Sequence, residues 1–315
     1  MAPANRRVGL ALSIALALLA GAAPAHATFP GHNGAIAFIS NGSSGDQQPI
    51  VDTRGLYAAG PGAKRADEPA VLLECQLTDS VPSGGDCTGT TYDAPSYSPD
   101  GRRLVVDTGE RLAVIDADGS DLTLLPATTA DDGNPAFAPD GRRIVFSGAN
   151  ERGTTDVYVR RLDGGGARVI VYDAADPVWS SRNEIAYVRD GNVYRADPNG
   201  RHRRFVTSGV SPDWSPNGRR VVLIRPSPNL TFAGSTGRIY IVNAGGGGLR
   251  RVGSNAYLSN PAWSPDGRWL AFDGFDLPVR KRRLTGRPIT REIAPTQIGD
   301  GGGFVASYDP AWQPR

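Results

Sequence analysis

The segment Pro95-Ser-Tyr-Ser-Pro-Asp-Gly-Arg-Arg-Leu-Val-Val106 decides the fold, because the chain repeats it. Close copies begin at Pro135, Pro212 and Pro261, and a degenerate copy begins at Pro177. The aromatic residues at the third position are 40, 42, 35 and 49 residues apart, and they are Tyr97, Phe137, Trp179, Trp214 and Trp263. A period near 40 residues is typical of the four-stranded blades of a β-propeller.

Each copy has the turn chemistry of a hairpin. In Ser-Pro-Asp-Gly the Pro presets φ at the second turn position, and Gly takes the left-handed position before the next strand. The repeated acids Asp100, Asp140 and Asp266 are therefore interpreted as turn residues. Two further strands follow each hairpin, and in the clearest copy they are residues 112–115 and 122–125. The sequence thus predicts four strands per repeat.

Two incomplete copies lie near the ends of the sequence. Pro310-Ala-Trp-Gln-Pro314 matches a first strand, and Asn33-Gly-Ala-Ile-Ala-Phe38 matches a second strand. Pairing them would complete one blade and close the ring, which removes exposed strand edges. We predict an all-β, six-bladed propeller over residues 28–315, with four-stranded blades and a ring closed by the terminal strands.

These repeats resemble those of the six-bladed propellers with TolB-like, or WD40-like (PD40), repeats. The resemblance rests on the recurring Ser-Pro-Asp-Gly motif and spans residues 29–315. It implies the propeller portion alone, since the additional N-terminal α/β domain usual in TolB-like proteins has no counterpart in this sequence. A TolB-specific partner therefore does not follow from it.

The N-terminal residues predict export. Arg6 and Arg7 precede an apolar run over residues 8–20, and Ala25-His26-Ala27 has the small-x-small pattern of a cleavage site. Residues 1–27 are predicted to be a signal peptide, cleaved after Ala27, which makes the protein secreted, either periplasmic or extracellular. We expect no membrane span after its removal.

The charge balance argues against nucleic acid as a partner. The whole chain has 34 Lys and Arg and 32 Asp and Glu, and the leader accounts for two Arg. The remainder is balanced, whereas nucleic-acid-binding domains usually have a basic excess. We expect a monomer with no cofactor.

Cys75 and Cys87 are the two cysteines of the chain. In an exported protein such an isolated pair predicts a disulfide bond, here within the long connection between Phe38 and Tyr97. A metal or redox role is less favoured, because two cysteines alone do not fill a tetrahedral zinc site and the spacing is not C-x-x-C.

A candidate binding site follows from the propeller interpretation. The first strand of each repeat is expected to line the channel, so the residue before its opening Pro should lie near one rim. These residues are Ala94, Asn134, Asp176, Ser211, Asn260 and Asp309. Five are short and polar, and two carboxylates suit a cationic group. Strand entry alone also favours such residues, so a purely structural role stays open.

A second candidate surface is basic. Arg280, Lys281, Arg282 and Arg283, with Arg287 and Arg291 nearby, fall on the last two strands of the Trp263 repeat. They are either a charged outer edge that resists strand pairing or a patch for an acidic partner or an anionic envelope surface.

No set of catalytic residues is predicted, and binding to a protein or peptide partner is the leading function. The alternative is a hydrolase or lactonase-type enzyme with a metal held at the channel mouth.

Overall fold

The computed structural model describes residues 28–43, 52–60, 70–77, 93–109, 111–226, 236–254, 257–274, 277–293 and 305–315. Every regular element in these ranges is a β-strand. No helix in the described part of the chain is long and apolar enough to cross a membrane. The predicted signal peptide, residues 1–27, lies outside the described residues, as does Cys87.

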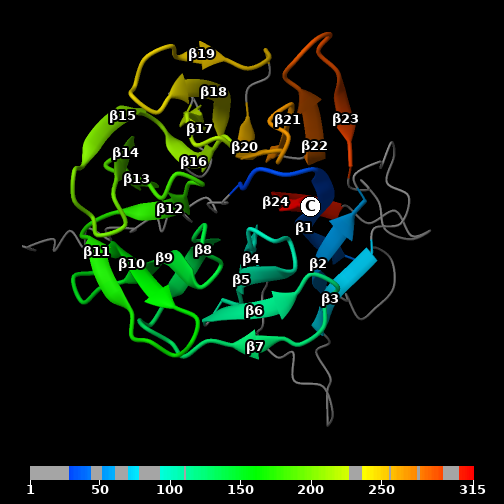
Figure 1. Cartoon of the computed structure of the whole chain (residues 1–315). Helices are drawn as coiled ribbons and strands as arrows, with labels where there is room; N and C mark the ends of the chain where they lie inside the picture. The colour runs from blue at the N-terminus through cyan, green and yellow to red at the C-terminus, as the bar shows by residue number, and fades with distance from the viewer. Residues whose placement is uncertain are drawn as a thin grey trace, which may run out of the picture.

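Hydrogen bonds join the strands into four four-stranded antiparallel sheets and one eight-stranded sheet (Figure 1). The first sheet contains β24 (Val305–Pro314), β1 (Asn33–Ser43), β2 (Asp52–Ala59) and β3 (Ala70–Leu77). The second contains β4 (Asp93–Tyr97), β5 (Arg103–Asp107), β6 (Leu112–Asp116) and β7 (Thr123–Leu124).

The third sheet contains β8 (Asp132–Phe137), β9 (Arg143–Ala149), β10 (Thr155–Arg161) and β11 (Arg168–Val171). The fourth contains β12 (Ala175–Trp179), β13 (Ile185–Arg189), β14 (Asn192–Ala196) and β15 (Arg204–Ser208).

The eight-stranded sheet differs from the prediction of separate four-stranded sheets. It combines β16 (Val210–Trp214), β17 (Arg220–Pro226), β18 (Gly237–Asn243) and β19 (Arg250–Arg251) with β20 (Leu258–Trp263), β21 (Trp269–Gly274), β22 (Leu277–Arg283) and β23 (Thr290–Glu292). A single residue pair, Gly237 with Leu258, joins the two halves. The merger of the two halves has a local cause, because the first residue of β18 pairs with the first residue of β20.

The sheets are arranged around a centre, with their first strands innermost (Figure 1). These strands contact one another in the succession β24, β4, β8, β12, β16, β20 and again β24. The predicted pairing of the terminal strands is confirmed, because β1 is hydrogen-bonded to β24 with Ile36 opposite Trp312.

The hairpin turns use their polar residues as predicted. The Asp100 carboxylate accepts hydrogen bonds from the Ser98 hydroxyl at 2.6 Å and from the Arg102 backbone at 3.1 Å. Asp266 accepts the equivalent bonds from Ser264 and Arg268, at 2.6 and 2.9 Å. These acids are bound by their own turns, which agrees with a structural role.

The second Arg of the repeat motif links neighbouring sheets. Arg143 lies over the ring of Trp179 at 4.9 Å, and Arg220 lies over Trp263 at 5.2 Å. In each case the aromatic ring belongs to the next repeat. Such cation–π contacts are worth roughly 0.5–2 kcal/mol each.

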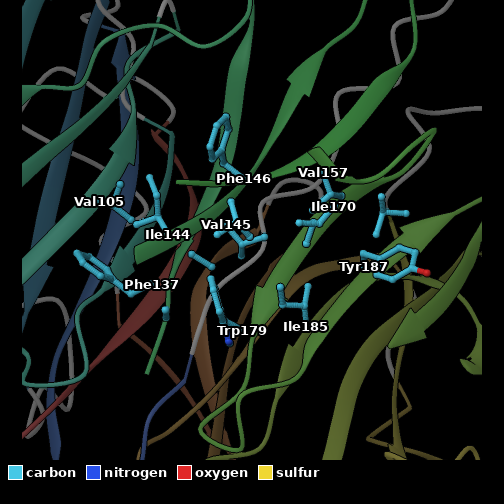
Figure 2. Close-up of a cluster of buried hydrophobic side chains, with 14 of the residues drawn as sticks. Val105, Phe137, Ile144, Val145, Phe146, Val157, Ile170, Trp179, Ile185 and Tyr187 are labelled. Atoms are coloured by element: carbon cyan, nitrogen blue, oxygen red, sulfur yellow. The ribbon is translucent and has the colours of Figure 1, made fainter. Parts of the chain in front are cut away.

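The aromatic residues of the repeats are buried between the sheets. Phe137 and Trp179 are fully buried in one apolar cluster that also contains Phe146 and Tyr187 (Figure 2). This cluster joins the second, third and fourth sheets, so each inner strand packs between two neighbours.

Candidate functional site at the inner strands

The six predicted rim residues share one unusual backbone conformation. All have positive φ, between 45° and 56°, although none is glycine. They are Ala94, Asn134, Asp176, Ser211, Asn260 and Asp309. The left-handed conformation costs an L-residue roughly 1–2 kcal/mol, less for Asn and Asp. Because this conformation recurs at the same position in every repeat despite its cost, it is a systematic property of the repeat.

A β-bulge accompanies each of these residues. In β4, for example, Asp93 is paired with Asp107 and Ser96 with Val105, so two residues oppose the single residue between those partners. The same shift occurs in the other five inner strands. A bulge accommodates the Pro that follows, which has no N–H for the ladder. The Pro lies inside the strand, at this bulge, and not at the first residue of the strand.

The six ring residues are more buried than residues at the rim of the channel, where the sequence analysis expected them. Asp176, Ser211, Asn260 and Asp309 are buried, Ala94 is fully buried, and Asn134 is partly exposed. They are therefore less accessible to a ligand than the sequence-based prediction of a rim implied. The structure brings neighbouring members together in two hydrogen-bonded groups.

The first group surrounds Asp309. The Asn260 side-chain amide donates to Asp309 at 2.6 Å and to Asp273 at 2.9 Å. The Asp309 backbone N–H also donates to Asp273, at 2.8 Å. The next repeat joins in through the Ala94 N–H, 3.4 Å from the Asp309 carboxylate. One amide and two carboxylates therefore share a buried space.

Burial raises the pKa of Asp309 well above its usual range, and the neighbouring carboxylates Asp273 and Asp93 raise it further. Burial also raises the pKa of Asp273, against hydrogen bonds from Ser259 and Asn260. Two adjacent buried carboxylates disfavour double ionisation. Oδ1 of Asp273 and Oδ1 of Asn260 have no hydrogen-bond partner among the described residues.

The second group surrounds Asp176. Its carboxylate lies 3.4 Å from the Asn134 side-chain amide and accepts a hydrogen bond from the Ser211 backbone. The Asp176 N–H donates to the Ser147 hydroxyl at 3.2 Å. Burial raises the pKa of Asp176 to about 7.

A further carboxylate adds to the acidic character. Burial raises the pKa of Asp107 to about 7, and Asp93, Asp131 and Asp132 contribute in the same direction. Gly133 leaves space for it, since a Cβ there would lie 2.7 Å from Asp107 Oδ2. The inner strands and the strands paired with them thus hold several acids with raised pKa values, whose ionised forms a nearby cation would stabilise.

Sequence reasoning missed Asp107, Ser147 and Asp273. They share one repeat position, on the second strand and directly after the last residue of the aligned motif, which is Val106, Phe146 or Phe272. Extending the aligned repeat by one residue would have found them. Their burial depends on the inner strand of the next repeat, which the motif itself does not show.

The four consecutive basic residues of β22, Arg280 to Arg283, lie in different environments. Arg280 pairs with Glu292 at 2.8 Å, and Lys281 is buried, 6.0 Å from the ring of Trp269. Arg282 is half-buried and donates to Thr290 Oγ1 at 3.0 Å, while Arg283 is exposed. The four residues alternate in direction along β22 and do not form one continuous patch.

A separate cavity of about 550 Å³ lies beside the hairpins of the fourth and fifth repeats, and none of the predicted site residues lines it. Its lining includes Arg182, Arg219 and the ion pair between Arg195 and Glu184.

No group of three His, Cys, Asp or Glu side chains in the described ranges is arranged to hold a metal ion. Cys75 lies on β3, but its predicted partner Cys87 is outside the described residues.

Comparison with known proteins agrees with this geometry. Residues 66–229 match the TolB β-propeller domain family (PD40), which is half of the chain. The protein belongs to this family. The propeller also resembles TolB from Acinetobacter baumannii, with a TM-score of 0.66 and 15% identity over 90% of this chain and 67% of that one.

Two further solved structures have the same fold. A putative TolB from Agrobacterium tumefaciens has a TM-score of 0.58 and 20% identity, covering 87% of this chain and 98% of its own. A chain of a nidogen/laminin complex has a TM-score of 0.58 and 10% identity, covering 88% and 98%. At these identities the likeness concerns the fold alone.

Proposed function

We propose that this TolB-family chain is an exported, six-bladed propeller that binds a protein or peptide partner through its inner-strand ring. The six-blade count treats β16–β19 and β20–β23 as two blades that share one bridging pair, Gly237 with Leu258. The β1–β24 pairing then closes the ring. Export, with cleavage after Ala27, is supported by the three-part leader.

The observation that carries the binding proposal is the repeated left-handed bulge with its buried acids. Bulges re-aim side chains at functional sites, and strained backbone clusters at such sites. Here one group on the inner strands holds Asp309 with Asn260, and a second group holds Asp176 with Asn134. A site with a few convergent polar groups is suited to recognition.

The acidic side chains of the ring determine which ligand group would bind there. The acids are buried and have raised pKa values, so a cation that reaches them stabilises their ionised forms. Because the ring residues are buried, the group must also be narrow. A Lys side chain offers both properties, since it is a long stem with a compact charge. The proposed partner therefore inserts a basic side chain between the inner strands.

The test begins with selection of displayed random peptides against the mature protein. We expect enrichment of peptides with a Lys or Arg, and we expect the double variant Asp176→Ala/Asp309→Ala to bind them at least tenfold more weakly. The control is Asp118→Ala, because Asp118 is an exposed turn residue that bonds Ser120. Enriched peptides without basic residues, or unchanged affinity in a folded double variant, would refute the proposal.

A further inference from the structure

The first described residues fill a place inside the ring. Thr28 and Phe29 are 2% and 3% exposed, although they precede β1 and belong to no strand. Phe29 is part of the apolar cluster that contains Phe137 and Trp179. In Figure 1 this blue segment crosses the ring beside β16 and β20 before it reaches β1.

Polar contacts fix the segment at the hairpin end of the inner strands. The Thr28 hydroxyl donates to Asp213 Oδ2 at 2.9 Å and lies 3.1 Å from the Trp263 carbonyl oxygen. Further along, the Gly31 N–H donates to the Pro265 carbonyl. The acidic groups around Asp176 and Asp309 lie at the opposite end of these strands, where each strand begins.

Asp213 is a buried carboxylate without a cation partner among the described residues. It is fully buried, and its Oδ2 also accepts the Trp263 N–H at 2.7 Å. Its Oδ1 has no hydrogen-bond partner in the described part of the chain. Burial raises the pKa of Asp213 well above its usual range, and only hydrogen bonds from Trp263, Thr28 and Trp214 oppose this. An unpaired buried charge is strongly unfavourable, so Asp213 is either protonated or paired with a cation at this place.

The α-nitrogen of Thr28 is suitably placed to be that cation. It belongs to the same residue as the Oγ1 atom that donates to Asp213 Oδ2 at 2.9 Å, three covalent bonds away, so a small adjustment of Thr28 brings it to the carboxylate. Inside a longer chain this nitrogen is a neutral amide. Cleavage after Ala27 converts it into an α-amino group, which is protonated below a pKa of about 8.

We propose that Asp213 is a binding site for a primary ammonium group, and that its occupant is the α-ammonium of Thr28 in the mature chain. The inference rests on the proposed cleavage after Ala27. Leader removal then has a structural consequence, because the new terminus inserts into the ring and neutralises Asp213, with Phe29 packed behind it. The precursor lacks this charge.

The first test measures reactivity of the α-amine. Exported protein is purified, its N-terminal residue is established by intact mass, and it is treated with 2-pyridinecarboxaldehyde, which modifies N-terminal amines. We expect modification at least tenfold slower than in Asp213→Asn, whose amide still accepts the Trp263 N–H. Asp266→Asn is the matched control and should leave the rate unchanged, because Asp266 contacts Asn33, just after the segment, only through its backbone N–H, which the substitution keeps.

The second test uses a double-mutant cycle in thermal unfolding. A Gly-Ser extension before Thr28 should lower the Tm of the wild type and have little further effect on Asp213→Asn. Equal labelling rates in folded wild type and Asp213→Asn, or additive effects in the cycle, would overturn the ion pair. A mature terminus other than Thr28 would instead refute the proposed cleavage site, so the two failures are distinguishable.

Discussion

Ile36 in β1 is the cross-strand partner of Trp312 in β24, so the first and last described strands form one sheet. Both side chains lie in an apolar cluster with Ala262 and Ala271 of β20 and β21. The two ends of the chain therefore hold the first sheet against the last repeat. Ile36 and Trp312 are 276 positions apart in the sequence, yet each depends on the other for its burial.

Removal of Tyr308–Arg315 should abolish cooperative unfolding, because β1 loses its partner and β20 loses a neighbour. A synthetic peptide of residues 305–315 added in trans should restore part of the transition. The measurement is thermal unfolding followed by circular dichroism. A truncated protein with the melting curve of the full chain would contradict closure by these strands.

Gly101 and Gly141 provide a matched pair of substitutions. Both occupy the same turn position, with φ of 68° and 63°. A Cβ at Gly101 would lie 2.0 Å from the Pro314 carbonyl oxygen, whereas the nearest atom at Gly141 is 3.7 Å away. Gly141→Ala should cost about 1 kcal/mol for its left-handed backbone. Gly101→Ala should cost several kcal/mol, because β24 must move.

Urea unfolding of the two Ala variants measures the difference. Since the turns are equivalent in sequence, only the contact with the C-terminal strand distinguishes them. Equal losses of stability would show that Pro314 does not pack against this hairpin.

Arg143→Ala should lower the free energy of unfolding by about 1 kcal/mol through loss of the contact with Trp179, with a small addition from the exposed ion pair with Asp140. Arg142→Ala is the control, because its side chain is exposed beside the same turn. The comparison is made by urea unfolding at two salt concentrations. If both substitutions have the same effect, the repeated Arg does not link the sheets.

The Cys75–Cys87 disulfide stays a prediction. Titration of the unfolded, non-reduced protein should find no free thiol, since an exported chain with one cysteine pair is expected to oxidise. Two titratable thiols would rule the bond out.

The repeat period and its turn chemistry were sufficient to predict the all-β propeller fold and the β1–β24 pairing. The six ring positions could also be located, because Pro marks the bulge in every copy. Their left-handed backbone could not be predicted, since Ala94 and Ser211 have no preference for it. The buried acids Asp107, Asp213 and Asp273 were missed because burial of a carboxylate depends on the neighbouring repeat. The Gly237–Leu258 bridge likewise depends on the placement of two repeats.

The buried acids predict an unusual dependence of stability on pH. The pKa values of Asp107 and Asp176 are raised from 3.8 to about 7 in the folded protein. Between these values the folded state binds more protons than the unfolded state, so stability falls as pH rises. The decrease that these two groups cause should extend from about pH 4 to pH 7, and a shift of about three pKa units corresponds to at most about 4 kcal/mol for each group, since each unit is about 1.4 kcal/mol.

Asp176→Asn removes one of these groups and should flatten the profile, with its largest relative gain in stability at neutral pH. Urea unfolding at half-unit pH intervals measures both curves, and Asp118→Asn serves as the exposed control. A wild-type protein whose stability rises from pH 4 to pH 7 would contradict the protonated state of the ring.

The same protons should be released when a basic side chain binds, because the cation favours the ionised carboxylates. Calorimetry in buffers of different ionisation enthalpy would detect that release and connect the strained ring to its proposed ligand.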